Sequence, residues 1–79
     1  MEKYKNVSGQ SWVSEYEIGD DFITVKFLVP SPSGATTYKY SYASAGKDII
    51  EKMKELAIAG EGLKTYITAS AHDLYESKS

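Results

Sequence analysis

The spacing of apolar side chains changes once along this chain, near residue 43, and that change limits the possible folds more than any other feature. Before it, apolar and polar residues alternate in three stretches, at 12–18, 22–29 and 36–42. A period of two is typical of strands with one buried face. After it, apolar residues recur three and four positions apart, as on an amphipathic helix. The pattern therefore predicts three strands followed by helices.

Short connections between the predicted strands favour an antiparallel meander. Gly19–Asp21 supplies residues that favour a turn, and Pro30–Gly34 predicts a loop because proline cannot donate to a strand ladder. Alternation assigns one face of the sheet to the core, and we expect that face to carry Trp12, Tyr16, Ile23, Val25 and Phe27.

Two helical stripes follow the strands. We expect Ser44 to cap the first helix at its N-terminus, and Gly60 and Gly62 to end it. The first stripe contains Ile49, Ile50, Met53, Leu56 and Ala57, and the second contains Leu63, Tyr66, Ile67, Ala71, Leu74 and Tyr75.

A half-apolar sheet and two amphipathic helices can bury their apolar faces only against each other. We therefore predict an α+β domain in which two helices pack on one face of a three-stranded antiparallel meander, in the order βββαα. Its expected extent is residues 11–76. Residues 1–10 and 77–79 are expected to be a flexible N-terminus and a flexible C-terminal tail.

The composition excludes several classes of functional site. The chain has 79 residues and no cysteine, so it can hold no disulfide, cysteine-based zinc site or thiol nucleophile, and little volume remains for a deep cavity. The single histidine, His72, has Ser70 and Asp73 nearby in sequence, but on a helix these would not face it. We expect His72 to face solvent near Glu76, and we expect no enzyme activity, cofactor or metal site.

Tyr38, Tyr40 and Tyr42 alternate along the third predicted strand, and two interpretations stay open. Exposed rings could stack on nucleic-acid bases while Lys39 meets phosphate. Alternatively, the rings pack beneath the helices and their hydroxyls reach the rim. The net charge of −2, with nine basic residues that are all lysine, favours the second interpretation because nucleic-acid-binding domains are usually basic.

The order and spacing of several segments resembles the KTSC domain, a small family named after the C-terminal domain of certain lysyl-tRNA synthetases and also found as single-domain bacterial proteins. The resemblance covers about residues 7–75 and ends at Tyr75. It rests on five segments, Ser11–Tyr16, Ile23–Phe27, Tyr38–Tyr40, Met53–Ala57 and Gly60–Ile67.

The function of that family is not established, and its association with the synthetases suggests RNA binding. This chain departs from the family pattern at two places. Lys64 stands near a position where many members have asparagine, and the last helix carries Asp73 and Glu76 but no arginine. The loop at 30–35 is also longer than the usual glycine turn. These departures weaken the implied RNA binding more than the implied fold.

The leading hypothesis is a non-enzymatic bacterial binding module that acts through a macromolecular partner. The alternative is single-stranded RNA or tRNA binding, with Tyr38, Lys39, Tyr40 and Tyr66 as contacts. A third hypothesis is a structural homo-oligomer that associates through a sheet edge. Because the N-terminus does not resemble a secretory signal and the longest apolar run is Phe27–Val29, we expect a cytoplasmic protein without a membrane partner.

Overall fold

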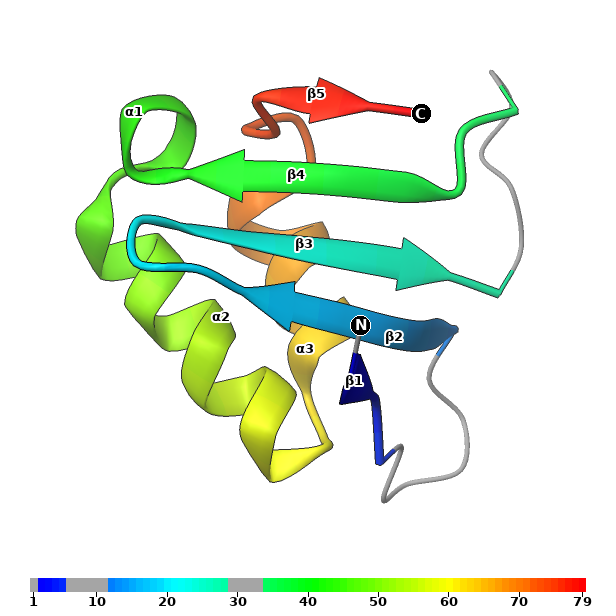
Figure 1. The fold of residues 1–79 in the computed structure, drawn as a ribbon. Coiled ribbons are helices and arrows are strands. Elements are labelled where there is room, and N and C mark those ends of the chain that lie inside the picture. Colours follow the sequence, from blue (N-terminus) through cyan, green and yellow to red (C-terminus); the bar gives the residue numbers. More distant parts are fainter. Residues whose placement is uncertain (1, 6–11, 29–33) are drawn as a thin grey trace.

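The computed structural model describes residues 2–5, 12–28 and 34–79, which form an antiparallel sheet with helices against one face (Figure 1). The five strands are neighbours in chain order: β1 (Glu2–Lys3), β2 (Val13–Ile18), β3 (Phe22–Phe27), β4 (Thr37–Ser41) and β5 (Ser77–Lys78). The helical layer contains α1 (Tyr42–Ala45), α2 (Lys47–Ala59), α3 (Leu63–Tyr66) and a π-helical turn, η1 (Ile67–Ala71). The predicted α+β class is confirmed, and the three predicted strands form the centre of the sheet.

The prediction of three strands is wrong, because both ends of the chain add a strand to the sheet. Glu2 of β1 lies opposite Tyr16, and Lys78 of β5 lies opposite Tyr38. These strands fall where the sequence predicts flexible ends, and two residues are too few to display a period. The remaining predictions near the gaps lie outside the described residues. They concern residues 6–10 of the N-terminal segment, Ser11, Val29 and the loop at 30–33.

The predicted core face of β2 is wrong at its start. Val13 is buried, whereas Trp12 is 54% exposed. The cause is a β-bulge: Val13 pairs with Phe27 and Glu15 pairs with Lys26, so Ser14 has no partner position in β3. One extra residue reverses the alternation of faces. Val13 and Tyr16 therefore both face the helices, although three positions separate them.

The first helix also begins earlier than predicted. Ser41, not Ser44, caps α1: its side chain accepts a hydrogen bond from the Ser44 backbone N–H at 3.2 Å. The Ser44 hydroxyl lies 3.0 Å from the Ser41 backbone N–H and accepts its hydrogen bond, which completes a capping box. Tyr42, the predicted last residue of the third strand, is consequently the first residue of α1.

The second predicted helix ends at Ala71 and does not continue to Tyr75. After η1, the backbone N–H of Glu76 donates a hydrogen bond to the Lys39 carbonyl at 2.6 Å. The chain must leave the helix to reach this position and form β5. Leu74 and Tyr75 nevertheless remain partly buried against the core, as does Tyr66.

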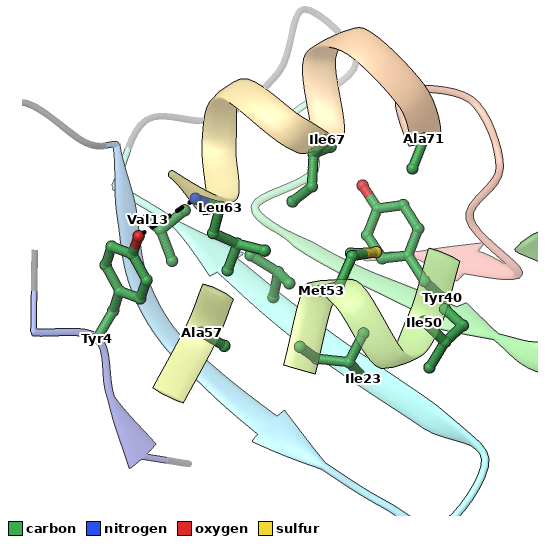
Figure 2. Packing of buried hydrophobic residues seen from close by; sticks show 11 residues of the cluster. Tyr4, Val13, Ile23, Tyr40, Ile50, Met53, Ala57, Leu63, Ile67 and Ala71 are labelled. Atoms are coloured by element: carbon green, nitrogen blue, oxygen red, sulfur yellow. Dashed lines mark hydrogen bonds between the residues drawn. The ribbon is translucent and has the colours of Figure 1, made fainter. Parts of the chain in front are cut away.

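The core lies between the sheet and the helices (Figure 2). Ile23, Tyr40, Ile50, Met53 and Leu63 are among its fully buried side chains. Its members also include Tyr4, which is 4% exposed and whose hydroxyl accepts a hydrogen bond from the Leu63 backbone N–H at 3.4 Å. Tyr4 is therefore part of the packed domain, although it falls where the sequence predicts a flexible N-terminus.

Candidate functional site

The two faces of the sheet have different chemistry. Helices cover one face, and the opposite face is free of helices in the described structure (Figure 1). The strand register assigns a mixture of acidic, basic and hydroxyl side chains to that outer face, including Lys3, Glu15, Glu17, Thr24, Lys26, Thr37 and Lys39.

Tyr38 and Tyr40 lie on the inner face of the sheet, opposite Val25 and Ile23 respectively. The Tyr40 side chain is buried, and its burial raises the pKa of its hydroxyl. Tyr38 is half-buried, and its ring packs edge-to-face against Phe27 and Tyr75 at centroid distances of 5.6 and 5.1 Å. This arrangement matches the interpretation in which the tyrosines of β4 pack beneath the helices.

Lys39 extends from the opposite face of β4. Its ammonium lies 3.5 Å from a Glu76 carboxylate oxygen and 4.8 Å from the centre of the Phe22 ring. The fourth predicted contact, Tyr66, comes from α3 and is partly buried against the core. The structure therefore does not bring Tyr38, Lys39, Tyr40 and Tyr66 together on one exposed surface.

A different surface combines exposed apolar side chains with a hollow. Glu2 of β1, Tyr16, Glu17 and Ile18 of β2, and Ile58 of α2 line an open space of about 490 Å³. Ile18 is 38% exposed and Ile58 is 58% exposed. We call this surface the Ile18–Ile58 hollow. It lies where the β1 edge of the sheet meets the second half of α2.

Two of the residues that line the hollow are acidic. Glu2 and Glu17 line it, and neither makes a salt bridge with another residue of the described chain. Asp20 and Asp21 follow Ile18 in the β2–β3 turn. Lys54, four residues before Ile58 on α2, forms a salt bridge with Glu51.

The Lys54 ammonium lies 3.0 Å from a Glu51 carboxylate oxygen and donates a hydrogen bond to the Asp20 carbonyl at 3.1 Å. Its positive charge is therefore already balanced. The hollow accordingly presents aliphatic contacts beside two carboxylates that form no salt bridge within the described residues.

Sequence reasoning missed this hollow, although Ile58 gave a signal. Ile58 is a large apolar residue that falls outside the apolar stripe of its helix. A helix residue of that kind either meets another element or stays exposed. Ile18 gave no comparable signal, because its exposure depends on how far α2 extends across β2.

His72 lies exposed beyond η1, with its Nδ1 atom 3.5 Å from an Asp73 carboxylate oxygen. The two residues stand in a turn and not on a helix, so adjacent side chains approach each other. Within residues 2–5, 12–28 and 34–79, no three histidine, aspartate or glutamate side chains are grouped so as to hold a metal ion. No helix in the same residues has the length and hydropathy needed to span a bilayer.

Comparison with known proteins found no match to any family model, any curated protein or any solved structure.

Proposed function

We propose that this chain is a non-enzymatic binding module that recognises a protein partner through the Ile18–Ile58 hollow. The observation that carries the proposal is the exposure of two isoleucines, from β2 and α2, on the wall of one hollow. Clustered apolar side chains that remain in contact with water typify interaction surfaces, because contact with a partner removes them from solvent.

The other exposed apolar pair, Trp12 and Leu28, supports no separate proposal. The Leu28 backbone N–H donates a hydrogen bond to the Trp12 carbonyl at 2.6 Å, so the two residues are neighbours across β2 and β3. The segments next to them in sequence, 6–11 and 29–33, lie outside the described residues. The Lys64 ammonium lies 5.0 Å from the centre of the Trp12 ring, so this side chain already has a partner within the domain.

The test is a comparison of the proteins retained by three immobilised variants from a lysate of the source organism. Leu28→Ser is the matched control for Ile58→Ser, because Leu28 is 60% exposed and Ile58 is 58% exposed. We expect one protein, identified by mass spectrometry, to bind wild type and Leu28→Ser but not Ile58→Ser. Equal retention by all three variants would contradict the proposal.

Binding of single-stranded RNA or tRNA by Tyr38, Lys39, Tyr40 and Tyr66 stays a prediction from the sequence. Its test is a titration with tRNA at low ionic strength, where phosphate contacts are strongest. Self-association, membership of the KTSC family, bacterial origin and cytoplasmic location also stay predictions.

A further inference from the structure

We infer that Tyr38 and Tyr75 form a site of oxidative cross-linking, at which a one-electron oxidant joins β4 covalently to the segment that follows η1, residues 72–79. The inference is independent of the proposed function. It is carried by three features of the tyrosine pair: the contact between the two rings, the access of solvent to both, and the hydrogen bonds that hold them together.

The rings of Tyr38, Tyr40 and Tyr75 meet on the inner face of the sheet. The shortest of their contacts joins Tyr38 and Tyr75, whose ring centres lie 5.1 Å apart with an interplanar angle of 76°. Tyr40 lies 6.4 Å from Tyr38 and 6.5 Å from Tyr75. A bond between two phenol rings leaves them twisted relative to each other, as Tyr38 and Tyr75 already are. The pair therefore needs only a small further approach to react.

Exposure distinguishes Tyr38 and Tyr75 from the other tyrosines in ring contact. Both are only partly buried, whereas Tyr40 is 1% exposed. Burial, together with the neighbouring Tyr38 and Tyr75, raises the pKa of the Tyr40 hydroxyl, which opposes the loss of a proton that accompanies oxidation of a phenol. Among the described residues, the remaining tyrosine contact joins Tyr16 to Tyr4, which is buried.

Hydrogen bonds next to the two tyrosines hold the rings in place. The backbone N–H of Glu76, the residue after Tyr75, donates to the carbonyl of Lys39, the residue after Tyr38, at 2.6 Å. The Glu76 carboxylate also lies 3.5 Å from the Lys39 ammonium. Because the reacting groups are already positioned, coupling within one molecule is favoured over coupling between two copies.

The reaction consumes two equivalents of a one-electron oxidant. Each phenol gives one electron to the oxidant and one proton to solvent, which leaves a phenoxyl radical on each ring. The two radicals combine through the carbon atoms next to their hydroxyls, and the hydrogens on those carbons are replaced on the oxygens. The product, dityrosine, has lost two hydrogen atoms in total. No cysteine thiol competes for the oxidant, because the chain has none.

The cross-link would fix a segment that is otherwise weakly anchored. None of residues 72–79 is buried, so this segment is held by Tyr75, by Leu74 and by hydrogen bonds at the edge of β4. Segments with few buried contacts open locally while the rest of a domain stays folded. A covalent bond to β4 would keep residues 72–79 attached in the presence of oxidants.

The test is oxidation of the full chain, at low concentration, by a ruthenium(III) tris-bipyridine complex that light and persulfate generate. We expect dityrosine fluorescence in a product with the mass of one chain less two hydrogen atoms. Cleavage after lysine should yield one linked pair of peptides, residues 27–39 with residues 65–78. Tyr38 is the only tyrosine of the first peptide, and the second contains Tyr66 and Tyr75.

Conservative variants identify the two rings. Tyr38→Phe and Tyr75→Phe keep the packed ring and remove the hydroxyl that coupling requires, so each should lower the yield of dityrosine at least about tenfold. Tyr66→Phe is the matched control, because Tyr66 is also partly buried and lies in the same peptide as Tyr75. Its yield should equal that of wild type.

Hydrogen exchange tests the consequence for residues 72–79. The Ser79 amide donates to the Thr37 carbonyl at 2.8 Å, and we expect it to exchange at least about fivefold more slowly in the cross-linked chain. Equal exchange would overturn the anchoring role. The site itself would be overturned by links that form only between copies, by oxidation confined to Trp12, or by a yield that Tyr75→Phe leaves unchanged.

Discussion

Tyr42, Glu51 and Lys54 join three separate parts of the chain at the surface. The Tyr42 hydroxyl donates a hydrogen bond to Glu51 at 2.7 Å, and Lys54 pairs with the same carboxylate. Lys54 also binds the carbonyl of Asp20. The start of α1, the middle of α2 and the β2–β3 turn are thereby connected through side chains that remain in contact with water.

We expect Tyr42→Phe to raise the pKa of Glu51. The hydrogen bond from Tyr42 lowers that pKa from its ordinary value of 4.5, and Lys54 acts in the same direction. Removing the hydroxyl should move the pKa back toward 4.5. The measurement is a titration of the Glu51 side-chain carbon signal by NMR, with Tyr66→Phe as the control. An identical midpoint in Tyr42→Phe and wild type would contradict the assignment.

The same contact has a defined dependence on pH. A carboxyl whose pKa is lower in the folded state stabilises the fold above its unfolded pKa, which is the ordinary value of 4.5 for Glu51. That contribution is lost as the pH falls through the folded pKa. The stability difference between wild type and Tyr42→Phe should therefore narrow below about pH 4.

Gly46 connects α1 to α2 in a conformation with φ of 93° and ψ of 149°. Essentially only glycine adopts this region. A Cβ atom added there would have nothing within 4 Å, so a substitution is strained by its backbone alone. We expect Gly46→Ala to lower the free energy of unfolding by about 1–3 kcal/mol, measured by urea denaturation.

The control for Gly46→Ala is Lys52→Ala, an exposed position on α2. Its salt bridge with Glu55 at 3.8 Å is exposed, so its loss should change stability by less than about 0.5 kcal/mol. Equal losses of unfolding free energy in the two variants would show that alanine adopts the backbone conformation of Gly46 without strain.

Among the elements, α2 has two faces with separate roles. Ile50, Met53 and Ala57 are buried against the sheet, whereas Ile58 is exposed at the hollow. We expect Met53→Ala to cost about 2–5 kcal/mol of unfolding free energy, because it leaves a cavity in the core. Ile58→Ser should change stability by about 0.5 kcal/mol or less. Urea denaturation of both variants measures the difference, and a large loss in Ile58→Ser would mean that this side chain is structural.

Prediction from sequence succeeded for elements with several periods of apolar spacing. The strands at 22–27 and 37–41 and the helix at 47–59 each contain enough repeats to define a buried face, and Gly60, with φ of 81°, ends α2 as expected. The bulge at Ser14 was not predictable in the same way. A bulge is defined by how β2 pairs with β3, because the extra residue shifts the pairing of the residues before it. That pairing depends on the tertiary structure and leaves no pattern in the local sequence.

The candidate site was less predictable than the fold. Tyr38 and Tyr40 were recognised as one face of a strand, but a period of two does not say which face the helices cover. The hollow combines residues from β1, β2 and α2, and the pairing of β1 with β2 leaves no periodic signal. Ile58 alone could have indicated an exposed apolar position.

At the scale of the whole molecule, Tyr4 helps to close the core from the N-terminal side of the chain. Tyr4 is buried, packs edge-to-face against Tyr16 at 6.5 Å between centroids, and binds the Leu63 backbone N–H at the start of α3. We expect Tyr4→Ala to cost about 3–5 kcal/mol, a large part of the stability of a domain of this size. Urea denaturation measures the loss, with exposed Lys3→Ala as the control. Similar stability of the two variants would mean that the tyrosine does not close the core.

The two terminal strands also affect how copies of this protein behave when they are crowded. β1 and β5 each contain two residues, so each outer edge offers too short a row of backbone groups to template a growing fibril. Removing either end would uncover β2 or β4, whose edges are longer. Because β1 and β5 each pair with part of these longer edges, we expect removal of either two-residue strand to increase aggregation of the protein.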